Sequence, residues 1–254
     1  MKNESDPVLD FAELALRNVQ VEQKGEEVRV KIREGTNAIA LVAVLTQIKE
    51  ATQRTQSLQS LRQLGIAMHN FHETHRHFPP PAIYSKDGKP LLSWRVDLLP
   101  YVEQEQLYRQ FHRDEPWDSE HNKKLLAHMP KLFAAPPGRE PKEPYHTYLQ
   151  VFVGKDAPFK DDFRKRMSIA DFKDGTSNTL LIVEAGEPVP WTKPADLAFD
   201  LKGPLPKLDG PFKDGFNAVF ADGSVSFLKH LLKEETLRAL ITPAGGEQLT
   251  GKEW

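Results

Sequence analysis

The stretch LRQLGIAMHNFHETHRHFPP, from Leu61 to Pro80, decides the fold of this chain. Its apolar residues recur at the spacing of an amphipathic helix, which is three or four residues. The buried face predicted from that spacing consists of Leu58, Leu61, Gly65 and Met68, with Leu64, Ala67 and Phe71 beside it. The prolines that follow His77 end the helix, because proline lacks the N–H that a helix interior requires.

Working upstream, the chain has no proline between Asn37 and His75. We therefore predict one long helix over residues 37–75, on the order of 55 Å at 1.5 Å per residue. Its middle, KEATQRTQS, is polar on all sides and is expected in solvent. The second half, from Leu58 onward, is expected to pack on a sheet that contains Phe220 and Phe227. An ordinary long core helix is the alternative.

Working downstream, the pattern predicts short elements separated by proline-rich loops. Short helices are expected at 96–111 and 119–128, with Asp118 or Ser119 capping the second. Strands are expected at 147–153, 179–184, 218–221 and 224–228, and a last helix at 234–240. The Asp222-Gly223 pair is a strong two-residue hairpin signal. These elements predict an α+β fold in which one long helix packs on a small antiparallel sheet.

Residues 1–36 have a different pattern and are expected to be separate from a main domain at 37–254. A short helical run after Asp6 and Pro7 is followed by VQVEQKGEEVRVKI, whose alternation around Lys-Gly is typical of a β-hairpin. A lone hairpin is only marginally stable in water. The segment is therefore expected to be the tail of an upstream domain or an appendage that packs on something else.

Composition narrows the function classes. Over 254 residues the formal net charge is -2, so no global field draws the chain to nucleic acid. The absence of cysteine excludes disulfides, thiolate zinc sites and cysteine nucleophiles. The longest apolar run, AIALVAVL, falls far short of the ~20 residues that span a bilayer. We expect no membrane insertion by this chain itself, and its composition is compatible with the cytoplasm as well as with the cell envelope.

A calcium site is one hypothesis for the segment DFKDGTSN. Asp171, Asp174 and Asn178 supply hard oxygen ligands around one glycine, and calcium takes six to eight oxygens. The spacing is not that of an EF-hand. The alternative is a turn in which these side chains bind their own backbone and start the next strand. No other cofactor is predicted.

The tryptophans Trp94, Trp117 and Trp191 stand in loop-like sequence and could bind sugars or partner peptides at the surface. The alternative is that each indole fills the core under a long loop, burying roughly 150–250 Å².

Two histidine-containing segments also offer polar chemistry. His69, His72, His75 and His77 have a weak metal-ligand spacing, and structural imidazoles at a helix end are the alternative. DEPWDSEHN places Asp114, Glu115, Asp118, Glu120 and His121 close together, which suits helix caps better than acid–base catalysis. No nucleophile elbow or phosphate loop is present, so no catalytic residue is assigned.

Five phrases in a fixed order carry a family resemblance: LRQLGIAMHNFHETHRHFPP, LSWRVDLLPYVEQEQLY, DEPWDSEHNKKLL, DGTSNTLLIVEAGEPVPWTKPADL and FADGSVSFL. Together they resemble the DUF1559 family of planctomycete-type bacterial proteins, over roughly residues 41–247. The resemblance implies a pilin-like or pseudopilin-like architecture and a cell-envelope or extracellular location. It also favours the calcium hypothesis, because several pseudopilin heads fold a loop around calcium.

The chain departs from the family pattern in two respects. Relatives usually begin with a prepilin leader and a hydrophobic helix, which this sequence does not show, so it is expected either to be part of a longer anchored protein or to have replaced the anchor. Relatives also commonly carry cysteine where this chain has Ser57 and Ala135. The resemblance itself implies no established biochemical activity.

The sequence therefore predicts a non-enzymatic structural or protein-interaction module whose partners are other protein subunits. A calcium-dependent or glycan-binding head is the alternative, with ligands at 171–178 or at the tryptophans. A hydrolase that uses the carboxylates of residues 114–121 is a remote third hypothesis.

Overall fold

The computed structural model describes residues 19–24, 27–32 and 38–247. The chain divides into two compact units between Gln53 and Arg54. Helix α2 (Ala38–His75) is one continuous helix, which confirms the prediction for residues 37–75. None of the helices in the described part of the chain combines the length and apolar character needed to cross a membrane.

The first unit contains the predicted hairpin. Strands β1 (Val19–Lys24) and β2 (Glu27–Ile32) pair antiparallel, from Val19 opposite Ile32 to Lys24 opposite Glu27. On the part of α2 in this unit, Val42, Leu45 and Ile48 are exposed at intervals of three residues. The helical run expected after Pro7 lies outside the described residues, and the domain boundary expected at 36/37 stays a prediction.

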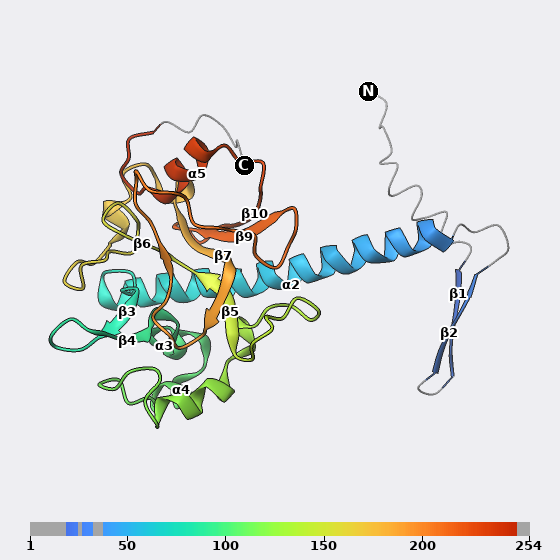
Figure 1. Cartoon of the computed structure of the whole chain (residues 1–254), viewed down its shortest axis with the longest axis horizontal. Helices are drawn as coiled ribbons and strands as arrows, with labels where there is room; N and C mark the ends of the chain where they lie inside the picture. Colours follow the sequence, from blue (N-terminus) through green and yellow to red (C-terminus); the bar gives the residue numbers. More distant parts are fainter. Residues whose placement is uncertain (1–18, 25–26, 33–37, 248–254) are drawn as a thin grey trace. The chain divides into compact units, whose positions relative to one another are not determined.

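The second unit is built on a four-stranded antiparallel sheet in the order β10-β9-β7-β5 (Figure 1). Its strands are β5 (His146–Gln150), β7 (Leu180–Pro190), β9 (Gly215–Phe220) and β10 (Val225–Lys229). Two small sheets accompany it: β3 (Ala82–Tyr84) with β4 (Pro90–Ser93), and the parallel pair β6 (Phe152–Val153) with β8 (Leu197–Ala198). The expected α+β class is confirmed, and the hairpin at Asp222-Gly223 joins β9 to β10.

Short helices fill the connections, as expected, but their bounds differ. The helix predicted over 96–111 is three pieces: α3 (Trp94–Asp97), η1 (Leu99–Val102) and α4 (Glu105–Tyr108). Pro100 lies in the first turn of η1, and Glu103 ends it with a left-handed φ of 61°, so one helix cannot continue. The remaining ones are η2 (Asn122–His128), η3 (Lys131–Phe133), η4 (Ile169–Asp171), η5 (Thr176–Asn178) and α5 (Glu234–Ile241). Ser119 accepts a hydrogen bond from Asn122 N at the start of η2.

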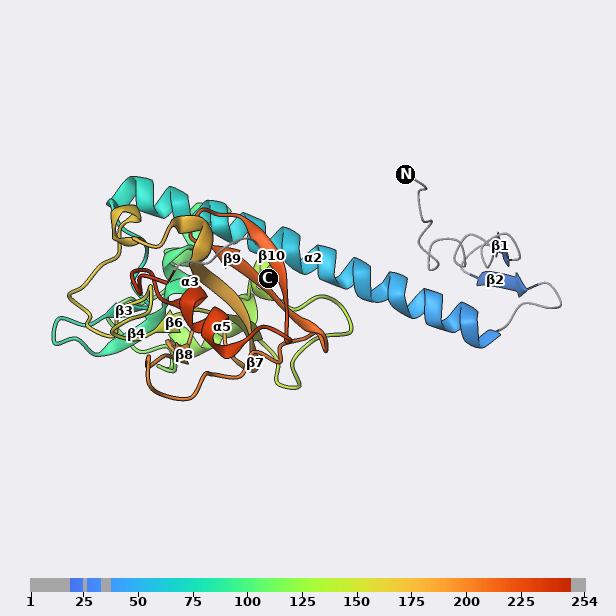
Figure 2. The same cartoon turned by 90° about the horizontal axis from the view of Figure 1, so that it is seen from above.

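The sheet separates two hydrophobic clusters, with α2 on one face and α5 on the other (Figure 2). Leu61, Leu64 and Met68 of α2 are fully buried in the first cluster together with Val219. Phe220 belongs to the second cluster, with Leu240 of α5. The prediction that the second half of α2 packs on a sheet containing Phe220 and Phe227 is confirmed, while Phe220 itself lies on the opposite face because side chains alternate along a strand.

Gly65 allows α2 to approach the β9–β10 hairpin closely. A Cβ at this position would meet Val219 Cγ1 at 3.1 Å and the Gly223 carbonyl oxygen at 3.2 Å. Phe227 of β10 is partly buried, and the guanidinium carbon of Arg54 lies 3.7 Å from its ring centroid. The close approach at Gly65 and the cation–π contact of Arg54 thus both hold α2 against the sheet.

A buried carboxyl lies between α2 and the sheet. Glu184 of β7 is 2% exposed, and its Oε1 accepts a hydrogen bond from the Ser57 hydroxyl. Its Oε2 accepts one from Asn217 N at 2.9 Å. Burial raises the pKa of Glu184 to about 7, although Ser57, Asn217 and Arg54 oppose the rise. Charge at Glu184 therefore destabilises the folded state.

We expect Leu61→Ala to lower the free energy of unfolding by roughly 2–5 kcal/mol, because it leaves a cavity between α2 and the sheet. Ile66→Ala is the matched control, since Ile66 is on the same helix and 57% exposed. Chemical denaturation of the two variants measures the difference. Equal losses, or no loss at Leu61, would contradict the packing of α2 described above.

Stability should also depend on pH through Glu184. The folded chain holds this proton up to about pH 7, whereas an unfolded glutamate loses it near 4.5. The folded state therefore binds more protons in that window, and the free energy of unfolding falls as pH rises through it, by about 3 kcal/mol in total. Glu184→Gln should raise the Tm at pH 8 and change it much less at pH 5.

Glu187→Gln is the control for that comparison, because Glu187 is on the same strand and is exposed. Thermal melts at the two pH values suffice. A Glu184→Gln effect of equal size at pH 5 and pH 8 would show that the buried carboxyl is not the cause.

Candidate functional site

The loop after β7 is anchored by Trp191. Its indole Nε1 donates to the carbonyl oxygen of Leu126 at 3.0 Å. Its rings stack on Phe133 and meet Phe111 edge-on, with centroids 5.8 Å apart in both pairs. Because Trp191 is fully buried, the residues that follow it have a fixed position against the core.

Asp196, five residues later, receives three donors at one oxygen. Its Oδ1 accepts from Trp94 Nε1 at 3.1 Å, from Arg95 Nη2 at 2.8 Å and from Val151 N at 3.0 Å. Burial raises the pKa of the Asp196 carboxyl, and the adjacent Arg95 guanidinium offsets part of that rise. The second oxygen, Oδ2, is buried and has no hydrogen-bond partner among the described residues.

The pairing with Asp196 also explains a break in the sheet. The strand predicted over 147–153 is divided at Val151, whose N–H binds Asp196 and whose carbonyl accepts from Leu197 N at 3.0 Å. The chain then leaves β7 and continues as β6 beside β8. This departure opens a space between the small β6–β8 sheet and the β3–β4 hairpin.

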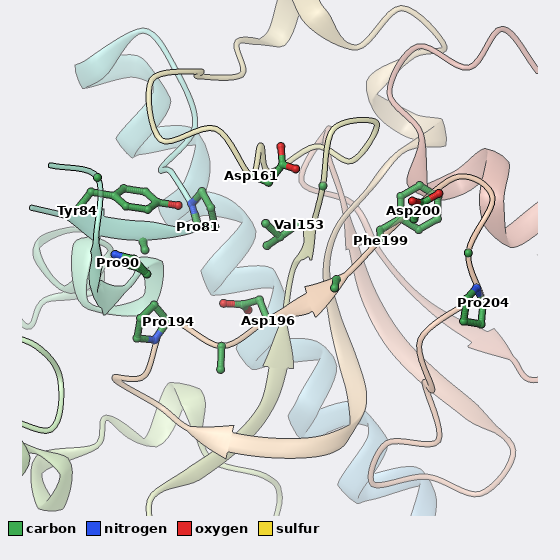
Figure 3. A pocket seen from close by; sticks show the side chains of 16 residues that line it. Pro81, Tyr84, Pro90, Val153, Asp161, Pro194, Asp196, Phe199, Asp200 and Pro204 are labelled. Carbon is green, nitrogen blue, oxygen red and sulfur yellow. The ribbon is translucent and has the colours of Figure 1, made fainter.

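That space is a cavity of about 730 Å³ (Figure 3). Its wall combines proline and aromatic rings with carboxylates from separate loops, together with small residues: Pro81, Ala82, Tyr84, Gly88, Pro90, Val153, Gly154, Asp161, Pro194, Ala195, Asp196, Ala198, Phe199, Asp200, Gly203 and Pro204. The ionisable side chains of this lining are three aspartates and one tyrosine, so it is acidic. We call it the proline-lined pocket.

Two features of the pocket are plain from its side chains. Tyr84 directs its ring into the space beside Pro81, and Asp161 and Asp200 lie on different sides of Val153 (Figure 3). Burial raises the pKa of Tyr84, and the negative charges of Asp196 and Asp161 add to the rise against the opposing effect of Arg166. The pocket therefore keeps a neutral phenol among carboxylates.

The three tryptophans do not form an exposed platform. Trp94 and Trp191 are fully buried, which corrects their assignment as surface binding candidates. Each has an acceptor for its indole N–H within the fold, so burial leaves no polar atom unsatisfied. Trp117 is partly buried, with the Lys193 ammonium 5.5 Å from its ring centroid. Trp94 contributes to the pocket indirectly, by holding Asp196.

The calcium candidates bind backbone groups of different segments. Asp171 Oδ2 accepts from the N–H and hydroxyl of Ser168, each at 2.7 Å. Asp174 accepts from Gly245 N at 2.6 Å and Gly246 N at 3.1 Å. Asn178 Nδ2 donates to the Asp174 carbonyl at 2.9 Å. The carboxylates thus receive N–H donors, and the calcium hypothesis stays a prediction.

The histidines of α2 and its end make separate contacts. His72 Nε2 accepts from Ile169 N at 3.2 Å, and burial, followed by His69, His77 and Arg76, lowers the pKa of His72. Within the part of the chain that the structure describes, no group of three or more His, Asp or Glu side chains has metal-binding geometry. In DEPWDSEHN, Glu115 forms a hydrogen bond of 2.9 Å with the preceding His112, whose ring stacks on that of His121 with centroids 3.6 Å apart.

Sequence reasoning missed the residues that build the pocket. Arg95 and Asp196 stand in ordinary-looking phrases, SWRVD and KPADL, and nothing in their spacing relates them. A charged residue inside an apolar run, such as Arg95, was the available signal, because buried charges require a partner. The partner itself is 101 residues away in the chain.

We expect calcium to leave the melting temperature unchanged, because the Asp171 and Asp174 carboxylates already bind N–H groups. A bound calcium ion would stabilise the fold by about 2.7 kcal/mol at a hundredfold excess over its dissociation constant. Asp174→Ala should destabilise the chain by roughly 1–3 kcal/mol with or without calcium, since two N–H donors lose their acceptor. Melts in millimolar calcium and in chelator test this; a calcium-dependent rise that Asp174→Ala abolishes would contradict it.

Comparison with known proteins finds one family that matches part of the chain. Residues 46–163 match the model of a family described as protein of unknown function (DUF1559). No curated protein matches the chain, and no solved structure does. The matched segment begins in α2 and extends past β6, so it contains the first three of the five phrases in full and neither of the last two. It includes most of the long helix and both Arg95 and Tyr84. The match supports the assignment of residues 46–163 to the DUF1559 family.

Proposed function

We propose that this protein is a non-enzymatic interaction module, a pilin-like head within a cell-envelope or secreted assembly, and that the proline-lined pocket receives a basic segment of a partner subunit. The observation that carries the proposal is the lining of the pocket, in which apolar rings alternate with three carboxylates. Such a surface suits a long cationic side chain better than an anion.

A lysine or arginine of an extended partner segment matches both parts of the lining. Its methylene groups would pack on the rings of Pro81, Pro90 and Phe199, and its charged end would approach Asp161 or Asp200. Long basic side chains bury their stems on apolar surface while the charge stays near water or a counter-charge. The charge complementarity would set the choice of partner and the rate of encounter.

The pocket is also rigid, which favours binding. Arg95 is fully buried and holds Asp196, while prolines limit the backbone at four positions of the wall. A site that is already in its bound conformation loses little entropy when a ligand binds. The rigidity of the pocket supports recognition of one defined partner segment rather than binding of many different segments.

Support for an assembly comes from the first unit by itself. Val42, Leu45 and Ile48 are exposed on one helix at intervals of three residues, the spacing by which one helix packs on another. In a pilin-like assembly the partner of this face would be the same helix of a second copy of the chain.

The pocket proposal is tested with a fluorescent pentapeptide that carries a central lysine between prolines, compared with the same peptide carrying Nε-acetyl-lysine. We expect the charged peptide to bind more tightly in fluorescence anisotropy, because only it can pair with the carboxylates. Asp161→Asn and Asp200→Asn should each weaken binding of the charged peptide about threefold or more. High salt should weaken binding to the unchanged protein more than binding to these variants, because each variant lacks one of the charges that salt screens.

Asp118→Asn is the matched control, since it removes one exposed carboxylate outside the pocket. Asp196 is left intact, because losing the partner of buried Arg95 would unfold the site. Equal binding of the two peptides, or equal weakening by the Asp118 and Asp161 variants, would refute a specific acidic pocket.

A further inference from the structure

A second cavity, of about 420 Å³, opens at the carboxyl end of α2. Its walls come from α2, the turn after it, α3, η1, α4 and two loops, and it shares no residue with the proline-lined pocket. Its lining is Phe71, His75, His77, Pro80, Asp97, Pro100, Tyr101, Tyr108, Arg113 and Arg166. We call it the arginine cavity.

Aromatic rings in mutual contact form one wall of the arginine cavity. The Phe71 ring lies 4.2 Å from that of His75 and 5.5 Å from that of Tyr101, measured between centroids. His75 Nε2 and the Tyr101 hydroxyl are 3.0 Å apart, within hydrogen-bond distance. This packing fixes the rings and provides an apolar surface on which a flat or aliphatic group can lie.

Two guanidinium groups supply the positive charge. Arg113 Nη1 donates to the Tyr108 hydroxyl at 2.7 Å, and its guanidinium lies over the same ring at 4.9 Å. Arg166 is held through Nη1, which donates to the carbonyl oxygens of Phe163 and Lys165. Each guanidinium has five N–H donors, so both keep donors for a ligand.

Asp97 supplies the opposing charge. Burial raises the pKa of its carboxyl to about 6, against the lowering effects of Arg113, Arg166, His77 and the Tyr108 hydroxyl. When Asp97 is ionised, the two guanidiniums and this carboxylate leave an excess of one positive charge among them. A ligand with a single negative charge would neutralise this excess.

From this arrangement we propose that the arginine cavity binds a small carboxylic acid, as its carboxylate, with the carboxylate on the two guanidiniums and the apolar body on the ring wall. Arginine binds a planar carboxylate through two parallel N–H bonds. A dianion such as sulfate has no apolar body to lie on Phe71 and Tyr101. Nothing in the chain's family description assigns a ligand to this region.

Binding should depend on pH in a definite direction. The ligand carboxylate and Asp97 repel each other when both are ionised. Below about pH 6 Asp97 is protonated, so this repulsion is absent. The affinity is therefore highest in mild acid and falls as pH rises to 8.

The test uses phenylacetate as the probe, with phenylacetamide as its neutral isostere and inorganic sulfate, which is doubly charged at both pH values used, as the dianion. Chemical-shift titration of the chain at pH 5.5 and pH 8 measures each affinity. We expect saturable binding of phenylacetate at pH 5.5, at least fivefold weaker binding at pH 8, and much weaker binding of the other two probes. The shifting signals should include Tyr101 and Tyr108.

Variants assign the effect to named groups. Arg113→Gln and Arg166→Gln should each weaken phenylacetate at least fivefold, whereas Asp97→Asn should strengthen it at pH 8 and flatten the pH dependence. Arg109→Gln is the control, because Arg109 is exposed, pairs with Glu105 and lies outside the lining. The gain expected from Asp97→Asn cannot arise from a folding defect.

Three results would overturn the proposal. Equal binding of phenylacetamide would show an apolar pocket without anion recognition, and tighter binding of sulfate would assign the arginines to a dianion. If phenylacetate still binds after both arginine substitutions, its binding site lies elsewhere on the protein. None of these outcomes bears on the lysine peptide, which tests a different pocket.

Discussion

The arrangement of α3, β6 and β8 in the second unit depends on the buried Asp196 carboxylate. One oxygen joins Trp94 and Arg95 of α3, Val151 just after β5 and the loop that leads to β8. Arg95 in turn donates to the Leu149 carbonyl. Breaking a buried ion pair by removing one partner costs on the order of 3–5 kcal/mol, because the other charge is left in the core. Segments far apart in the chain thus share one electrostatic requirement.

The position of the proline-lined pocket follows from that requirement. Because Val151 turns its N–H to Asp196, the strand cannot stay paired with β7, and β6 joins β8 instead. The prolines and Tyr84 of the β3 region then face the new small sheet across an open space. The pocket is a consequence of how the core satisfies a buried charge, and its acidic character comes from Asp161 and Asp200, because Arg95 compensates the charge of Asp196.

The contact between α2 and the four-stranded sheet combines buried apolar side chains with a buried carboxyl. Leu61, Leu64 and Met68 bury apolar surface around Gly65, whereas Glu184 introduces a carboxyl that is best protonated. Ser57 donates to that carboxyl from the helix, at the position where relatives are expected to carry cysteine. A hydroxyl can satisfy a buried carboxyl more effectively than a thiol, so Ser57 and Glu184 are understandable as a pair.

The two cavities carry opposite charge. The proline-lined pocket presents carboxylates to a cation, and the arginine cavity presents guanidiniums to a carboxylate. Arg166 lines the second and still lowers the pKa of Tyr84 in the first, so the two sites are close enough to influence each other electrostatically. A protein-interaction module with a small-molecule site beside its docking pocket is the functional picture that follows from our two proposals.

Local pattern alone determined the long helix, the hairpin at Asp222-Gly223, the class of the fold and the family, because helical spacing, turn chemistry and ordered phrases act over a few residues. The burial of the Trp94 and Trp191 indoles, the break at Val151 and the opposite faces of Val219 and Phe220 were decided by tertiary structure. Each depends on partners distant in the chain: Asp196 lies 101 residues from Arg95 and 45 from Val151. A charged residue inside an apolar run indicates that a buried partner exists, but only the packing of the whole chain selects which residue that partner is.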